Sequence, residues 1–537
     1  MTRTNRIASK ATTSRAALAA ALLGALAAPV FAPAPALAAG EDTIVIARDT
    51  DFNSLDPARA WCDSCQIYMS SVYETMISVN PKTGAIEPRL ATSWEVNDDQ
   101  TEFTFHLDPD AVFSDGSPVE AKDLKWTIER LRDLKEGPSF FVGGVETIET
   151  PDAHTLVIRL NAPDSEFMAK ASAPYVVAIN SDVAIKAGAS GDPTTDRAEP
   201  WFLQNSAGSG PYVLESYRPD DELRLALNPH HKSDKSPLPV VIRDVKDAVG
   251  QAQMLENGGA DIAMQVDTIT AQSVRSPDVV FDLVPSYNMI YVALSPGAKD
   301  NEVPLTPKIR EAFGYALDYE GILEYAVGGD GDLQASPIPN GFPGSKDLPL
   351  PHEDLDKARA LLAEAGVPDG FPLKAIYPDF NLYGVDLNTM MQKVQQDLAR
   401  VGIEVSLQPV TFAVWGEEVN ASGIPLTALF YAPDYFGSGQ YFSYFTMTPD
   451  ARWYQRAGGD KAEGLKNERE LELMAEYGAA GPDDVTRLAH ELGLEMIKDR
   501  IIFPLVNPRL VLGYRKGVTG VAYSVCCQIV LEDLGRE

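Results

Sequence analysis

Hydrophobic and polar positions alternate in two neighbouring stretches of the chain, 94–96 and 103–107, and this spacing predicts half-buried β-strands. The polar run 97–100 between them predicts a turn, so the two strands should form a hairpin. Ser-Asp-Gly-Ser-Pro at 114–118 predicts a second turn. From Ala121 onward, leucines and an isoleucine recur at helical spacing, which predicts an amphipathic helix. Taken alone, this order of hairpin, turn and helix is typical of a scaffold element in an α+β domain.

Strand and helix patterns follow one another along the rest of the chain, and no internal repeat is visible. The stretches 145–148 and 155–160 predict a second pair of strands around a turn at 151–153. One long helix is predicted over 307–325. The other strands are predicted at 43–47, 239–247 and 403–405, and the other helices at 248–257, 354–366 and 390–402.

The stretch 90–132 also matches a longer pattern of specific residues. It reads Leu-Ala-x-x-Trp-Glu-Val, a polar turn, Phe-x-Phe-x-Leu, and later Phe-x-Asp-Gly-x-Pro-x-x-Ala-x-Asp. In this it resembles the signature segment of the family 5 extracellular solute-binding proteins, the dipeptide- and oligopeptide-binding type that delivers ligands to ABC importers. The resemblance extends from about residue 44 to about residue 511, with further short matches at 55–57, 208–212, 258–263 and 308–318.

The resemblance implies an α/β fold of the bilobal periplasmic-binding-protein type with an extra third lobe. Mixed sheets flanked by helices would form discontinuous domains joined by hinge strands, and the ligand would lie between lobes I and III. Lobe I would combine 41–86, 205–290 and 505–537, lobe II would be 87–204, and lobe III would be 291–504.

The N-terminus has the pattern of a secretory signal peptide. Four basic residues precede an Ala- and Leu-rich run at 16–30, and Ala36-Leu37-Ala38 forms a cleavage site, so removal of 1–38 is expected. The run is too short for a membrane span and is followed by prolines. We therefore expect a soluble protein of the periplasm, exported by the general secretory route.

Charge narrows the range of partners. The formal net charge is −32, and the predicted cleavage would remove four basic and no acidic residues. Such an acidic chain is not expected to bind nucleic acid or anionic membranes. The charge mildly favours a cationic ligand, although solubility alone explains it as well.

The loop at 431–435 is the strongest candidate for ligand binding. It reads Tyr-Ala-Pro-Asp-Tyr, and in peptide-binding members of the family an aspartate in such a loop pairs with the α-ammonium group of the peptide. The resemblance assigns this role to Asp434, whereas a simple turn-capping aspartate is the alternative. The sequence then departs from the family pattern. Many members continue with any residue, an acidic residue and proline, whereas this chain continues with Phe436-Gly437-Ser438-Gly439. Ala428 also stands where some members carry an arginine for the peptide carboxylate.

Further ligand-binding candidates are mostly aromatic. Trp61, Trp415 and Tyr431 could line a side-chain pocket beside Tyr435, and burial in a core is the alternative for each. Arg452 is a candidate for the missing carboxylate anchor. Neither a metal site nor a cofactor is expected, since the six histidines are scattered.

The sequence contains four cysteines, and we expect disulfides because the periplasm is oxidising. Cys62 and Cys65 lie near the mature N-terminus, and Cys526 and Cys527 lie near the C-terminus. Three pairings are possible. We expect bridges between the two pairs, which would join the terminal segments, and a four-thiolate metal site is the alternative.

The function expected from this resemblance is the capture of peptides, or of a related amine-bearing solute, for an ABC permease and its ATPase subunits. A monomer is expected. The alternatives are a periplasmic hydrolase and a binding protein for a sugar, an opine or a metal complex. The sequence contains no G-x-S-x-G, H-E-x-x-H or P-loop motif, so no enzyme is expected.

Overall fold

The computed structural model describes residues 43–80, 84–233, 235–379, 381–421, 423–462, 464–525 and 527–537. The predicted signal peptide lies outside the described residues. The chain divides into two units, Met1–Ala38 and Ala39–Glu537. The second unit contains three large sheets, and we name its parts after them.

The seven-stranded part has the strand order β12-β21-β11-β1-β10-β9-β8. Its middle strand β1 pairs in parallel with β10 and β11, whereas the other neighbours are antiparallel, so the sheet is mixed. All five residues of β1 are buried, as expected for a hydrophobic central strand covered on both faces. The strands are β1 Ile44–Arg48, β8 Tyr212–Arg218, β9 Glu222–Leu227, β10 Val240–Asp244, β11 Ile262–Ala263, β12 Val279–Val284 and β21 Leu510–Arg515.

The four-stranded part contains the predicted hairpin and helix. Its antiparallel sheet has the order β4-β5-β7-β6, and Trp94 faces Phe105 across the hairpin. Helix α2 covers the sheet with its leucine face and starts at a capping box between Glu120 and Asp123. The hairpin, the second strand pair and this helix are thus confirmed as β4 Ala91–Val96, β5 Glu102–Leu107, β6 Val145–Asp152, β7 Thr155–Leu160 and α2 Ala121–Leu134.

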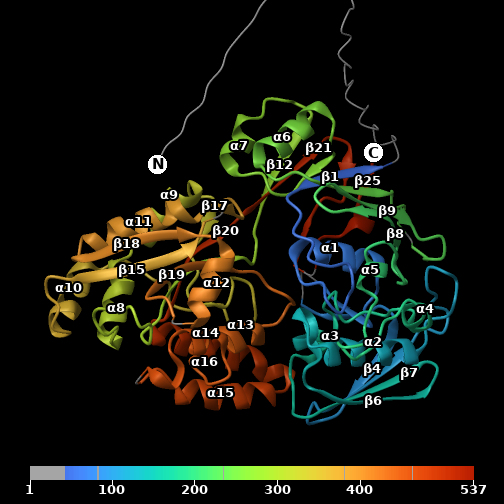
Figure 1. Cartoon of the computed structure of the whole chain (residues 1–537), viewed down its shortest axis with the longest axis horizontal. Coiled ribbons are helices and arrows are strands. Elements are labelled where there is room, and N and C mark those ends of the chain that lie inside the picture. Colours follow the sequence, from blue (N-terminus) through green and yellow to red (C-terminus); the bar gives the residue numbers. More distant parts are fainter. Residues whose placement is uncertain are drawn as a thin grey trace, which may run out of the picture. The chain divides into compact units, whose positions relative to one another are not determined.

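The six-stranded part has the order β14-β20-β13-β19-β15-β18. Two hydrophobic clusters cover its two faces, one with helices α8 to α11 and one with α12 to α16 (Figure 1). The chain enters this part from β12 to β13 and leaves it from β20 to β21, so two connections join it to the seven-stranded part. Its strands are β13 Met289–Leu294, β14 Gly331–Asp332, β15 Phe371–Pro378, β18 Ile403–Val410, β19 Leu426–Tyr431 and β20 Ile502–Pro508.

The single helix predicted over 307–325 is wrong. The structure has two helices, α8 Pro307–Ala316 and α9 Tyr319–Val327. The Asp318 carboxylate accepts a hydrogen bond from the Gly321 amide and so caps the second helix. The hydrophobic spacing continues across the break, which is why periodicity alone did not reveal it.

The remaining elements are short or flank the sheets. The other helices are α1 Asp63–Val72, α3 Phe167–Ala171, α4 Ser181–Lys186, α5 Glu199–Phe202, α6 Ala248–Asn257, α7 Thr268–Ser273, α10 Leu355–Glu364, α11 Leu387–Ala399, α12 Phe412–Ala421, α13 Gly439–Phe445, α14 Arg452–Arg456, α15 Glu468–Gly478 and α16 Pro482–Asp499. Short 3₁₀ helices span Gly137–Val142, Gly459–Lys461 and Leu531–Asp533, and short strands are β2 Ile77–Val79, β3 Ile86–Pro88, β16 Asn381–Leu382, β17 Val385–Asp386, β22 Val518–Thr519, β23 Tyr523–Ser524, β24 Gln528–Ile529 and β25 Gly535–Arg536.

A buried charge network joins α2 to the Leu-Asp-Pro turn at 55–57. The Arg130 guanidinium donates to both carboxylate oxygens of Asp56 and, through Nε, to Asp196 Oδ2 at 3.1 Å. All three side chains are almost completely buried. The partly exposed side chain of Arg59 also approaches both carboxylates. The aspartate of this motif is therefore an internal anchor of the seven-stranded and four-stranded parts.

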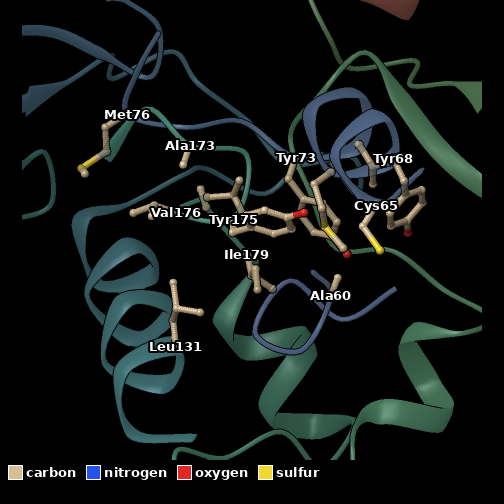
Figure 2. Close-up of a cluster of buried hydrophobic side chains, with 14 of the residues drawn as sticks. Ala60, Cys65, Tyr68, Tyr73, Met76, Leu131, Ala173, Tyr175, Val176 and Ile179 are labelled. Atoms are coloured by element: carbon tan, nitrogen blue, oxygen red, sulfur yellow. The ribbon is translucent and has the colours of Figure 1, made fainter. Parts of the chain in front are cut away.

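Helix α1 is packed into the same core. Its residues Cys65 and Tyr68, and Tyr73 just after its end, lie among buried side chains from α2 and from the segment 173–179 (Figure 2). The Tyr175 hydroxyl exchanges hydrogen bonds with the backbone of Cys62, accepting from its amide and donating to its carbonyl. The start of α1 is thus held rigidly, and this start carries the residues described next.

Candidate functional site

Asp434 lies in a loop between the end of β19 and the start of α13. Its amide donates to Gln440 Oε1 at 2.8 Å, and Gln440 Nε2 donates in turn to the carbonyls of Tyr435 and Gly437. Gln440 is buried, so these bonds are shielded from water. The loop therefore holds the aspartate in one place.

The Asp434 carboxylate meets Trp61 of the segment that precedes α1. Trp61 Nε1 donates to Asp434 Oδ1 at 2.9 Å, which joins the seven-stranded part to the six-stranded part. No Lys, Arg or His of the described residues forms an ion pair with this carboxylate. Burial raises the pKa of Asp434 to about 7, while the Trp61 bond lowers it and the charge of Asp63 raises it. The result is a partly buried carboxylate that has no cation beside it among the described residues.

Asp63 is a second carboxylate at the same junction, and it was not among the residues predicted from the sequence. Tyr383, in the turn between β16 and β17, donates its hydroxyl to Asp63 Oδ2 at 2.9 Å. Burial and the neighbouring Asp51 raise the pKa of Asp63 to about 6, whereas Arg48 lowers it. No spacing pattern marks this residue, because its partners come from segments far away in the chain.

Aromatic side chains surround the Asp434 loop. The Tyr431 ring packs against Tyr441, Tyr444 and Phe445, with ring centroids 4.8 to 5.2 Å apart. Burial raises the pKa of Tyr431 well above its usual value, and the Asp434 charge raises it further. The Tyr441 hydroxyl is buried and makes no hydrogen bond to any described residue. A ligand group at Asp434 would therefore meet a largely apolar wall with one free hydroxyl.

Tyr435 points away from this wall. Its hydroxyl donates to Glu166 Oε2 at 2.8 Å, and Glu166 belongs to the four-stranded part. Its ring packs on Phe141, so Tyr435 is a contact between two parts of the protein.

Two of the predicted site residues lie elsewhere. Trp415 is 2% exposed and donates its indole N–H to Thr427 in the core of the six-stranded part, which matches the alternative of core burial. Arg452 is exposed on α14 and bonds to Asn420. Ala428 is fully buried in β19 opposite Val292 and lies in the hydrophobic cluster of that sheet. No described contact joins any of these residues to Asp434.

The predicted bridges between the two cysteine pairs are wrong. Cys62 and Cys65 form a disulfide with each other, with their Cα atoms 4.9 Å apart. Cys527 is disulfide-bonded as well, and Cys526 lies outside the described residues. Because Cys62 and Cys65 are bonded thiols, they are not metal ligands here. The close bridge arises because the first turn of α1 brings the two side chains together.

We expect this disulfide to stabilise the site locally. The loop it closes is very short, so replacing both cysteines by serine should lower the free energy of unfolding by about 2 kcal/mol or less. We expect the main effect to be a loss of ligand affinity rather than a loss of stability, because Trp61 and Asp63 flank Cys62. Thermal unfolding and ligand titration of the wild type and the double variant check this expectation. Equal ligand affinity of the two proteins would contradict it.

Within the described part of the chain, no helix combines the length and the apolar character needed to span a membrane.

Comparisons with known proteins agree with one another. The family model described as "Bacterial extracellular solute-binding proteins, family 5 Middle" matches residues 85–452. The chain is 28% identical to the probable D,D-dipeptide-binding periplasmic protein DdpA of Escherichia coli (strain K12), over 77% of this chain and 79% of that protein.

Solved structures show the same fold. A dipeptide-binding protein from Pseudoalteromonas sp. SM9913 in complex with Met-Leu matches 92% of this chain and all of its own with a TM-score of 0.77, at 18% identity. The binding protein AgaA of A. tumefaciens R10 in complex with agropinic acid matches 92% of this chain and 99% of its own with a TM-score of 0.74, at 21% identity.

Proposed function

Because the chain belongs to the bacterial extracellular solute-binding proteins of family 5, we propose that it captures a peptide or a related amine-bearing solute at Asp434. This membership confirms the predicted family and the predicted fold class. The predicted lobe boundaries at 86/87, 204/205, 290/291 and 504/505 remain a prediction. The proposal places the ligand between the seven-stranded and six-stranded parts, where Trp61 and Asp434 meet.

The observation that carries the proposal is the unpaired Asp434 carboxylate. Taking a carboxylate out of water is costly unless a cation or several donors compensate, and Trp61 supplies one donor. An ammonium group beside Asp434 would supply charge and further donors at once. The relatives named above are a probable D,D-dipeptide-binding protein and a dipeptide-binding protein in complex with Met-Leu, and dipeptides are solutes with a free ammonium group.

A second candidate is an amine-bearing solute other than an ordinary peptide. Ala428 is buried in β19 and Arg452 bonds to Asn420, so neither supports a peptide carboxylate beside Asp434. Asp63 adds a second carboxylate at the junction, and it accepts a hydrogen bond from Tyr383 and lies near Arg48. A solute with more than one cationic group fits these facts.

We also propose that the protein delivers its ligand to an inner-membrane ABC permease and its ATPase subunits, as other members of the family do. We also propose export to the periplasm with cleavage after Ala38. Amino-terminal sequencing of the mature protein should then begin at Ala39.

Native mass spectrometry of protein purified from its own periplasm tests the function. We expect a bound amine-bearing solute, and its mass distinguishes a peptide from an opine. Added tri-alanine should bind and N-acetylated tri-alanine should not, because acetylation removes the ammonium charge. Equal binding of both peptides would contradict the ammonium site. Conversion of the bound molecule during incubation would favour the hydrolase alternative.

A further inference from the structure

Glu166 is a buried residue of the four-stranded part, and among the described residues its carboxylate accepts hydrogen bonds only from donors of the six-stranded part. The hydroxyls of Tyr435 and Tyr477 donate to it at 2.8 and 2.5 Å. The Gly439 amide donates to both of its oxygens, at 2.8 and 2.9 Å. Glu166 is 6% exposed, so water does not compete for these bonds.

This carboxylate has no cation beside it in the described part of the chain. Its charge is therefore compensated by hydrogen-bond donors alone. All of these donors lie across the junction, so separating the two parts would remove them together. Two neighbouring bonds cross the same junction, from the Ser165 amide to the Gly478 carbonyl at 3.0 Å and from the Ser165 hydroxyl to the Tyr477 carbonyl at 2.8 Å.

Two glycines make room for Glu166. A Cβ atom at Gly439 would lie 2.2 Å from Glu166 Oε2, and one at Gly437 would lie 2.8 Å from Oε1. Neither glycine is at positive φ, so space rather than backbone conformation requires them. Gly437 and Ser438 stand where the family pattern has an acidic residue and proline, and Gly439 follows them.

We propose that Glu166 is a positioning residue for Asp434. Glu166 holds the ammonium-binding loop in place only while the four-stranded part is docked against this loop. The link is short, because Gly439 and Tyr435 contact Glu166, and Gln440, the residue after Gly439, accepts a hydrogen bond from the Asp434 amide. Ligand capture would then depend on the contact between Glu166 of the four-stranded part and the six-stranded part. This inference rests on the proposed function of Asp434.

A double-mutant cycle on the full-length mature protein tests the proposal. The variants are Glu166→Ala, Gly439→Ala and the double variant, with Glu149→Ala as a matched control. Glu149 is also a glutamate of the four-stranded part, but it is exposed and pairs with Arg159. The first measurement is amide hydrogen exchange over 434–445 without ligand, and the second is the affinity for tri-alanine.

We expect Glu166→Ala to speed exchange at Gly439 at least tenfold and to weaken tri-alanine binding about fivefold or more. Gly439→Ala should have a similar effect because its methyl group collides with the carboxylate, and the double variant should recover part of the loss. Glu149→Ala should change neither measurement. Unchanged exchange in Glu166→Ala, or full additivity in the cycle, would overturn the proposal.

Glu166→Gln provides a second variant of nearly the same volume in case Gly439→Ala does not fold. It retains one acceptor oxygen, so we expect intermediate exchange, and wild-type exchange would count against the proposal. If wild-type protein does not bind tri-alanine, the peptide assignment fails, whereas the exchange measurements still decide the role of Glu166.

Discussion

Asp434→Asn should weaken the binding of an amine-bearing solute by at least about 30-fold, because it removes the charge that compensates a desolvated ammonium group. The substitution keeps the shape of the side chain and the oxygen that accepts from Trp61. Isothermal titration of both proteins with tri-alanine measures the effect. Asp300→Asn serves as a control, since Asp300 is an exposed aspartate of the six-stranded part that pairs with Lys374.

The same carboxylate predicts how binding depends on pH. Burial raises the pKa of free Asp434 to about 7, and a bound ammonium group would lower it. Binding therefore releases a proton below pH 7, and affinity should rise by up to about tenfold per pH unit between pH 5.5 and 7. Above about pH 8 the ligand amine loses its proton and affinity should fall again. Asp434→Asn should lose most of this rise and keep only the weaker contribution of Asp63, whose pKa is about 6.

The free energy of unfolding should change with pH in the direction opposite to the affinity. A carboxyl whose pKa is raised in the folded state binds more protons there than in the unfolded chain, so the free energy of unfolding falls as pH rises from about 4 to 7. At pH 8 the ligand-free Asp434→Asn variant should therefore be more stable than the wild type by about 1–3 kcal/mol. Thermal unfolding at pH 5 and pH 8 measures this, and an unchanged affinity together with an unchanged stability would exclude Asp434 as the ammonium site.

Arg130→Leu should cost about 3–5 kcal/mol of stability, since it leaves Asp56 and Asp196 buried without their main cation. Arg59 remains nearby but is partly exposed and compensates them only in part. Arg130→Lys should lie in between, because an ammonium group cannot make the same fork of bonds to both aspartates.

Arg132→Leu is the matched control for this substitution. It removes a half-exposed arginine of the same helix that pairs with its neighbour Asp133 and donates to the carbonyls of Val145 and Glu146, so a loss of about 1 kcal/mol is expected. Thermal unfolding of the three variants at pH 7 gives the comparison. Equal stability of Arg130→Leu and Arg132→Leu would show that the buried network contributes little.

The regular elements could largely be predicted from the sequence, because their hydrophobic spacing is a local property. The hairpin of β4 and β5, the helix α2 and the strand pair β6 and β7 all form where the pattern placed them. The long helix over 307–325 failed for a local reason too, since the capping of α9 by Asp318 interrupts an otherwise continuous pattern.

The disulfides show where such reasoning ends. Four cysteines in two pairs allowed three pairings, and the sequence contains nothing that measures the distance between the pairs. The structure joins Cys62 to Cys65 because one helical turn already brings their Cα atoms to 4.9 Å.

By itself, the sequence determined the family, the fold class and the loop that carries Asp434, because each depends on residues adjacent in the chain. Only the tertiary structure decided that Trp61 meets Asp434, that Asp63 and Glu166 each lie at a junction with the six-stranded part, and that Trp415 is buried in a core. These facts depend on which surfaces of separate segments pack together. Burial and charge at a junction are set by all segments that meet there, and no single stretch of sequence contains them.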